Sequence, residues 1–424
     1  MADPITTLVT EMGKKAREAS RGLLMADPAA KIAALMRLAA LLEARQEAII
    51  AANALDVDAA LASGLEKPKV DRLRLTPAII AEMAAACRQL AAEPDLVGAL
   101  DSQWVQPNGL LVGRMRIPLG VVAMIFESRP NVTIDSAILC IKSGNAVILR
   151  GGSEALHSNM LLMGLVQEAL ESASLPRDAV QLVPVRNREA VGALCRLDQY
   201  IDVMIPRGGE GLIATVTARA TMPVLKHDKG VCHAYVDETA DLALAVPVIV
   251  NSKAQRPSTC NTLECLLIHE RVLESLIPSL SRELAEAGVA VRACGTTLPL
   301  FQQTAIAAAP ARPEDFGKEF LDLILAVKAV KDMDEAMDHI AEYGSRHTEC
   351  VFASDAGRVR RFLRQVDASV VLHNASIRLN DGGQLGLGAE IGISTSKMHA
   401  YGPMGIRELT TTKFVVLGSG QLRS

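Results

Sequence analysis

The chain has 424 residues, and its 44 basic and 48 acidic side chains give a formal net charge of -4. Half of the residues are hydrophobic and 22% are charged, which excludes a disordered chain and, at this length, predicts two or three folded domains. No concentrated cluster of Lys and Arg stands out, so nucleic acid is not an expected partner.

The first part of the chain is predicted to be helical. Ala, Leu, Ile and Met recur at helical spacing through residues 31–53 and again through 77–92. Asp27 followed by Pro28 is typical of a helix cap and a first-turn proline. A different pattern follows at residues 101–116, where an Asn-Gly pair separates two β-rich runs. It predicts a β-hairpin, in an arm of residues 101–118.

From Gly120 onward, short apolar runs alternate with helical ones, which predicts parallel βαβ units. The strands are almost wholly apolar, as expected for sheets covered on both faces. We therefore expect an α/β fold with two parallel-sheet, Rossmann-like domains. The predicted strands are 120–126, 146–149, 181–185, 203–206, 224–225, 234–236, 263–268, 289–291, 323–327, 350–353, 370–372 and, in the tail, 413–417. Helices are predicted over 155–172 and 188–196.

Targeting signals and local metal-binding patterns are not found in the sequence. No apolar run approaches the roughly 20 residues that span a bilayer. The start, Met1-Ala2-Asp3-Pro4, lacks the basic and apolar segments of a secretory signal, so a cytoplasmic protein without membrane contact is expected. The eight cysteines are widely spread and include no CxxC pair, so neither a disulfide scaffold nor a bound metal is expected.

Cys260 has the sequence setting of a nucleophile more than any other cysteine. Pro257 should end the preceding helix, which leaves Cys260 in a polar loop before the strand at 263–268. Lys253 and Arg256 are near in sequence and would favour a thiolate. A structural role remains the alternative at this point.

The second candidate cysteine is Cys232, because His233 follows it. Adjacent side chains in a strand point to opposite faces, so this pair is not expected to cooperate.

Polar or glycine-rich turns follow several predicted strands. Residues 206–212 and 150–154 each end a strand and begin a helix, where backbone N–H groups favour anions. A plain tight turn and a solvated strand end are the respective alternatives. Residues 127–131 place polar side chains at a carboxyl strand end, where open α/β sheets bind ligands. Residues 380–390 form a glycine-rich loop that could serve as a lid or substrate loop.

Four of these strings together resemble the aldehyde dehydrogenase superfamily over nearly the whole chain. The most specific is Gln255-Arg256-Pro257-Ser258-Thr259-Cys260-Asn261, and the others are 127–131, 226–236 and 386–404. The resemblance implies a cofactor-binding domain at 1–230, a catalytic domain at 231–375, and a return segment at 376–424 with a C-terminal strand. This strand and the hairpin arm are the parts by which such proteins form homo-oligomers.

The resemblance also implies an activity. It is NADPH-dependent reduction of L-glutamate 5-phosphate to L-glutamate 5-semialdehyde, through a thioester on the cysteine and with release of phosphate. This is the second step of proline biosynthesis, and a separate glutamate 5-kinase would supply the substrate and could contact the reductase. The preference for NADPH over NADH and the oligomer size are left open.

Residue roles are carried over position by position. The resemblance implies Cys260 as nucleophile with Asn131 at the oxyanion, and a nicotinamide cofactor held by Arg150, Ser153, Gly208, Gly209, Gly211 and Glu319. Arg256 is the candidate for the leaving phosphate. Arg378 and Asn374 are candidates for the amino-acid end of the substrate.

One departure from hydrolytic aldehyde dehydrogenases favours this activity. Those enzymes carry a glutamate that activates water, and this chain has His227 at or near that place, with Asp228 as a possible substitute base. The alternatives are a hydrolytic NAD-dependent aldehyde dehydrogenase, a CoA-dependent acyl reductase, and a non-catalytic scaffold of the same fold.

Overall fold

The structure is a computed structural model that describes residues 3–227 and 229–423. The chain divides into two compact units and passes between them more than once. Unit 1 comprises Met1–Lys226, Gly386–Gly392 and Met404–Ser424, and unit 2 comprises His227–Leu385 and Ile393–Pro403. The domain limits expected at residues 230 and 375 stay predictions. Within the described residues, no helix is both long and apolar enough to cross a bilayer.

Helices make up the start of unit 1, as predicted. Asp27 accepts a hydrogen bond from the backbone N–H of Ala29 at 2.7 Å and so caps the second helix, with Pro28 in its first turn. The expected run at 31–53 is divided at Arg45, a break that periodicity alone does not mark. The helices of unit 1 are α1 Pro4–Leu24, α2 Pro28–Ala44, α3 Gln46–Ala62, α4 Lys67–Leu73, α5 Pro77–Ala92, α6 Asn131–Ser143, α7 Leu156–Ser172, α8 Glu189–Leu194 and α9 Glu210–Arg219.

A four-stranded parallel sheet forms the centre of unit 1. Its order is β5-β4-β3-β6, and its strands are β3 Val121–Phe126, β4 Ala146–Arg150, β5 Val180–Leu182 and β6 Val203–Arg207. Alternate side chains enter different layers: Ala123 belongs to the core that includes Val9 of α1, whereas Met124 contacts Ser136 of α6. The strand expected at 224–225 is reduced to an isolated bridge between Val224 and Met204, because only one residue pair is in register.

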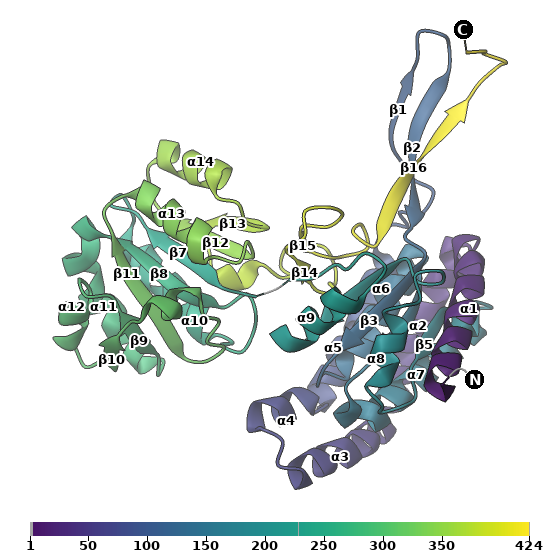
Figure 1. Cartoon of the computed structure of the whole chain (residues 1–424), viewed down its shortest axis with the longest axis horizontal. Coiled ribbons are helices and arrows are strands. Elements are labelled where there is room, and N and C mark those ends of the chain that lie inside the picture. The colour runs from purple at the N-terminus through teal and green to yellow at the C-terminus, as the bar shows by residue number, and fades with distance from the viewer. Residues whose placement is uncertain (1–2, 228, 424) are drawn as a thin grey trace. The chain divides into compact units, whose positions relative to one another are not determined.

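The predicted hairpin is confirmed, and the tail strand joins it. Strands β1 Leu100–Val105, β2 Leu111–Pro118 and β16 Thr410–Leu417 form an antiparallel sheet in the order β1-β2-β16, here called the arm (Figure 1). Gly109 has a φ of 86°, which a glycine adopts readily at the turn. Both edge strands of the arm carry exposed apolar side chains, including Val105 and Phe414.

Unit 2 is built on a seven-stranded parallel sheet, which confirms the second α/β series. The order is β10-β9-β11-β8-β7-β12-β13. The strands are β7 Cys232–Val236, β8 Leu263–His269, β9 Ala290–Ala293, β10 Ala308–Pro310, β11 Ile324–Val330, β12 Thr348–Phe352 and β13 Val370–His373. A short antiparallel pair, β14 Ile393–Ser394 and β15 Gly402–Pro403, is separate from this sheet.

Two hydrophobic clusters cover opposite faces of the unit 2 sheet. One contains side chains of α10 Leu242–Ala254, α11 Leu273–Glu286 and α12 Leu298–Gln302. The other contains side chains of α13 Met333–Tyr343 and α14 Ala356–Gln365. Short 3-10 turns lie at Ser153–Ala155, Arg177–Ala179, Glu270–Val272, Pro313–Gly317 and Ile377–Leu379.

Candidate active site

Cys260 lies in the loop between α10 and β8 of unit 2, where the sequence predicts it. The helix ends at Ala254, and the hydroxyls of Thr259 and Thr262 donate to the carbonyl oxygen of Arg256 at 3.0 and 2.9 Å. These bonds fix the loop around the cysteine. Cys260 is only partly buried, whereas six of the other seven cysteines are buried. An accessible thiol on a structured loop is what a nucleophile requires.

The segment before β7 packs closely against the cysteine loop. A side chain at Gly230 would place its Cβ 2.1 Å from the carbonyl oxygen of Cys260, so only glycine fits there. The Cys232 thiol lies 3.3 Å from the same carbonyl oxygen. His233, the next residue, belongs to the other face of the sheet, beside Glu349. The sequence prediction that Cys232 and His233 do not cooperate is therefore confirmed.

Two arginines lie near Cys260 within unit 2. Arg378 donates from Nε to Oε1 of Gln255 at 3.0 Å. Its Nη1 is buried and has no hydrogen-bond partner among the described residues. Burial, and then the positive charge of Arg256, lower the pKa of Arg378, while Cys260 acts in the opposite direction. A buried guanidinium nitrogen that lacks a protein acceptor is suited to an anionic ligand.

Lys253 and Glu264 form a fully buried ion pair beside the same loop. Lys253 Nζ lies 2.7 Å from Glu264 Oε2, and both side chains have no exposed surface. Burial raises the pKa of Glu264 to about 7, against the effect of Lys253. The other oxygen, Oε1, accepts from the backbone N–H of Leu321 at 3.2 Å. Sequence reasoning assigned the Lys253 charge to the thiol, but its ammonium is bonded to Glu264.

Glu319 lies in the loop that this ion pair holds. Leu321, two residues later, has a φ of 54° and is tied to Glu264 through its N–H. The charge of Glu319 contributes to the raised pKa of Glu264, after burial and opposed by Lys253, so the two carboxylates are near each other. The structure thus connects the segment before Cys260 with the loop expected to contact the cofactor ribose.

Asn374 has a set of backbone contacts at the end of β13. Its Oδ1 accepts from the N–H of Ala353, and its Nδ2 donates to the carbonyl oxygen of Ala353, both at 3.2 Å. These bonds join the ends of β13 and β12. The substrate-binding role expected for Asn374 stays a prediction.

His347 is a buried neighbour of the site that sequence reasoning did not find. Its Nδ1 lies 3.6 Å from the Cys232 sulfur and 2.7 Å from the Thr348 hydroxyl, and its ring meets that of His227 edge-on at 5.8 Å. Burial, and then His227, lower the pKa of His347 to about 3. Asp228, the other candidate base, lies outside the described residues.

Acid should destabilise the fold through His347. Its folded-state pKa lies below the ordinary value, so its contribution is present above about pH 6.5 and is lost as pH falls toward 3. His347→Gln should flatten the decline of unfolding free energy below pH 6.5 by up to about 1.4 kcal/mol per pH unit. Urea unfolding at pH 7.5, 6 and 5 measures this. Gln303→Asn, an exposed change that involves no titratable group, should keep the wild-type slope, and equal slopes in all three proteins would contradict the assignment.

The carboxyl ends of β3, β4 and β6 meet at one edge of the unit 1 sheet, where the chain reverses its strand order. Arg150 ends β4 and donates to the carbonyl oxygens of Gly151 at 2.9 Å and Arg186 at 3.2 Å. Its Nε is buried, without a hydrogen-bond partner in the described chain, and burial lowers its pKa. Ser153 is exposed and begins the 3-10 turn that follows.

The turn after β6 leads directly into α9. A Cβ at Gly208 would lie 2.5 Å from Oε2 of Glu127, and this oxygen accepts from the N–H of Gly209 at 3.0 Å. A Cβ at Gly209 or Gly211 would have no described atom within 4 Å. The turn therefore has open space beside a helix N-terminus, where an anionic group is favoured.

Asn131 begins α6 at the end of the β3 turn. Its Nδ2 donates to Oδ2 of Asp135, one helical turn later, at 3.0 Å. One of its two amide hydrogens is thus engaged within unit 1. The expected oxyanion role of Asn131 stays a prediction.

Each unit, considered by itself, contains some of the site residues that the sequence predicts. In unit 2, Arg256 and Arg378 lie near Cys260, and the Glu319 loop is tied to the same region through Glu264. In unit 1, the expected cofactor residues follow neighbouring strands of one sheet. Sequence reasoning missed Glu264 and His347. Glu264 gave no local signal because it lies inside the apolar strand β8, and His347 gave none because its contacts are with Cys232 and His227, far away in the chain.

Known proteins resemble this chain in both sequence and structure. The aldehyde dehydrogenase family profile matches residues 6–309. The gamma-glutamyl phosphate reductases of Nitratidesulfovibrio vulgaris (strain DP4) and Solidesulfovibrio magneticus are 61% identical over 419 residues and 60% identical over 412 residues. These alignments cover 99% of both chains in the first case, and 97% of this chain and 98% of the relative in the second. The crystal structure of gamma-glutamyl phosphate reductase from Thermotoga maritima has a TM-score of 0.94 and 44% identity, and covers 98% of this chain and 100% of that chain.

Proposed function

This chain belongs to the aldehyde dehydrogenase family, and from that premise we propose that it reduces L-glutamate 5-phosphate to L-glutamate 5-semialdehyde with NADPH. It is an oxidoreductase of that family, and such enzymes use a nicotinamide cofactor. The observation that carries the proposal is the accessible thiol of Cys260 beside a buried, unsatisfied guanidinium nitrogen of Arg378, counted among the described residues. A thiol next to an anion-binding group suits an acyl phosphate.

The proposed chemistry proceeds through Cys260. Its thiolate attacks the acyl carbon, the bond from that carbon to the phosphate oxygen breaks, and phosphate leaves with the electron pair. The product is a thioester. NADPH, when bound, supplies the hydride that reduces this thioester. The carbon–sulfur bond then breaks, which releases the aldehyde and restores the thiolate. Backbone N–H groups near Cys260, with Asn131, are proposed to stabilise the oxyanion.

Two arginines are proposed to bind the negatively charged groups of the substrate. Arg256 is assigned to the leaving phosphate and Arg378 to the amino-acid end, because both cations lie near Cys260 and Nη1 of Arg378 lacks a described acceptor. A planar guanidinium can bind a carboxylate or phosphate through two hydrogen bonds. Asn374 is kept as a further candidate.

The cofactor is proposed to bind at the carboxyl edge of the unit 1 sheet. The open space at Gly209 and Gly211 and the N-terminus of α9 fit a pyrophosphate, and the buried Nε of Arg150 lacks a described acceptor. Ser153 and Gly208 complete this set in unit 1. Glu319 of unit 2 is proposed to hold the nicotinamide ribose.

In this proposal, water does not hydrolyse the thioester. The position of the hydrolytic glutamate is occupied at or near His227, which stacks edge-on against the neutral His347. We infer that the reaction takes place in the cytoplasm as the second step of proline biosynthesis. A glutamate 5-kinase reaction must supply the acyl phosphate, and we propose that this kinase contacts the chain.

The reverse reaction tests the proposal most directly. Purified protein, NADP and glutamate semialdehyde should give NADPH only when inorganic phosphate is added, because phosphate must resolve the thioester. Turnover without phosphate would instead indicate a hydrolytic enzyme, and turnover only with CoA would indicate an acyl-CoA reductase. Repeating the assay with NAD measures the cofactor preference. Arg378→Gln should raise the KM for semialdehyde, whereas the exposed Arg312→Gln should not.

The arm is proposed to join copies of this chain. Its edge strands β1 and β16 leave exposed apolar side chains such as Val105, Phe414 and Val416, and exposed edge strands readily pair. The double variant Phe414→Asp/Val416→Asp should lower the molar mass measured by light scattering after size-exclusion chromatography. Lys413→Glu, an exposed change on the same strand, should keep the wild-type mass. A monomeric wild-type protein would refute the proposal.

A further inference from the structure

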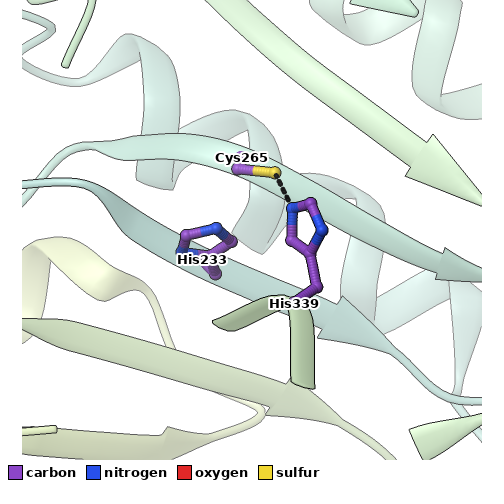
Figure 2. Close-up of side chains that lie close together, drawn as sticks. All are labelled: His233, Cys265 and His339. Carbon is purple, nitrogen blue, oxygen red and sulfur yellow. Dashed lines mark hydrogen bonds between the residues drawn. The ribbon is translucent and has the colours of Figure 1, made fainter. Parts of the chain in front are cut away.

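Two histidines and a cysteine meet inside unit 2, on the face of the sheet opposite Cys232. The cluster consists of His233 on β7, Cys265 on β8 and His339 on α13, and all three side chains are buried. Figure 2 shows the three side chains turned toward one another. Their ligand atoms all lie within 4.8 Å of one another. None of the three takes part in the proposed reduction.

The backbone fixes this arrangement. His233 and Cys265 are direct partners in the parallel register of β7 and β8, so both side chains leave the same face of the sheet. Helix α13 packs on that face through Met333, Ala336 and Ile340, which belong to the same hydrophobic cluster as Cys265. His339 is therefore held above the strand pair by the core of the unit.

The distances suit a thiophilic metal ion. Cys265 Sγ lies 3.8 Å from His339 Nε2 (Figure 2). A tetrahedral zinc with a Zn–S bond of about 2.3 Å and a Zn–N bond of about 2.0 Å holds these two atoms about 3.5 Å apart. Little movement would bring them to bonding distance.

His233 is the second, independent indication of a ligand. Its ring has no exposed surface, and neither ring nitrogen has a hydrogen bond to any of residues 3–227 or 229–423. Buried polar atoms are rarely left in this state, and a bound ion is one of the standard reasons for it. A metal ion would satisfy the nitrogen that faces Cys265.

Glu349 provides the outer partner that metal-bound histidines usually have. Its Oε2 accepts from the backbone N–H of His233 at 2.8 Å and lies 3.5 Å from Nδ1 of the same residue. A carboxylate this close to Nδ1, moved within hydrogen-bond distance on metal binding, would orient the imidazole and leave Nε2 for the metal. In this arrangement Nε2 of His233 is the ligand atom.

We propose that His233, Cys265 and His339 form a binding site for Zn²⁺ or a similar thiophilic divalent cation that stabilises unit 2. Three protein ligands of this kind leave a fourth position for water. The site is separate from Cys260 and supplies no group to the reduction, so it concerns the stability of the unit and not the chemistry.

A cavity offers a route for the ion. It has a volume of about 410 Å³ and is lined by His339 together with the acidic side chains of Asp338 and Glu342. Carboxylates along an entry path favour a cation. Lys328 also lines the cavity, but its ammonium is paired with Glu335 at 3.0 Å.

Cobalt(II) absorption tests the site, with Cys260→Ala as the parent protein to remove the partly exposed thiol of the proposed nucleophile. One equivalent of Co²⁺ should give the near-ultraviolet band of a thiolate–cobalt bond and visible bands of tetrahedral intensity. Both should be lost in Cys260→Ala/Cys265→Ala. They should remain in Cys260→Ala/Cys140→Ala, in which another fully buried cysteine is changed. Circular dichroism confirms that each variant is folded.

Thermal unfolding gives the second readout. Zn²⁺ should raise the melting temperature of the parent and of the Cys140 control, and should leave the Cys265 variant unchanged. A second variant, Cys260→Ala/His339→Gln, keeps the Cys265 thiol but removes one nitrogen ligand, so it should bind Co²⁺ more weakly. This variant replaces the Cys265 variant in the test if the latter does not fold. A parent protein with no thiolate–cobalt band at one equivalent, or a band that survives Cys265→Ala, would overturn the proposal.

Discussion

Cys260→Ala is expected to reduce the rate of semialdehyde formation by at least about 10³-fold, because removing the nucleophile of a covalent mechanism leaves only binding and oxyanion stabilisation. The fold should be unaffected, since the side chain is partly exposed on a loop fixed by Thr259 and Thr262. Oxidation of NADPH at 340 nm with chemically or enzymatically generated acyl phosphate measures the rate, and the melting temperature checks the fold.

The matched control is Cys294→Ala. Cys294 is the other cysteine that is not fully buried, and it lies at the end of β9 beside Thr297. Its loss should leave the rate within about threefold of wild type, since surface and non-site changes rarely affect the transition state. If Cys260→Ala kept wild-type turnover, or if both variants lost activity equally, the thioester route would be wrong.

Lys253→Met is expected to give the largest loss of stability, roughly 3–5 kcal/mol, because it leaves the buried carboxylate of Glu264 without its counter-charge. Burial already raises the pKa of Glu264 to about 7 even beside Lys253. Without Lys253 the carboxylate should protonate on folding, so the loss should be smaller at pH 5 than at pH 8. Urea unfolding at both pH values measures the change.

The double variant Lys253→Met/Glu264→Gln should recover much of that stability, since no charge then remains buried. Arg37→Met provides a surface comparison: Arg37 and Glu168 form an exposed pair at 2.9 Å, and its loss should cost at most about 1 kcal/mol. Equal costs for the buried and the exposed pair would contradict the interpretation. Because Glu264 also holds Leu321, Lys253→Met should additionally raise the KM for the cofactor if Glu319 contacts the ribose.

The sequence predicted the fold to the extent that the fold depends on local patterns. Apolar runs located the main strands of both sheets, and Asp27-Pro28 marked a helix start that the structure confirms. Strand β10 was missed because Ala308–Pro310 is three residues long, too short for a period to appear. The prediction of a strand at 224–225 was wrong for a related reason. Two consecutive apolar residues are too few to indicate a strand, and the structure has only a single β-bridge there.

The sequence predicted the candidate site only where the residues that form it are neighbours in the chain. Pro257 and the polar residues around Cys260 gave a local signal, and that loop has the expected form. Glu264 and His347 reach the site through long-range contacts that no spacing rule encodes. The absence of CxxC likewise tests only metal sites formed by neighbouring residues, whereas His233, Cys265 and His339 are brought together by strand register and helix packing.

Because the chain passes between its two units more than once, the two units are completed at different times during synthesis. Unit 2 contains no residue beyond Pro403, while unit 1 still lacks Met404–Ser424 at that point, including all of β16. Until those last residues leave the ribosome, β2 presents an unpaired row of backbone N–H and C=O groups from Leu111 to Pro118. A nascent or C-terminally truncated chain therefore exposes an additional strand edge that is prone to aggregation, the edge of β2 that β16 otherwise covers.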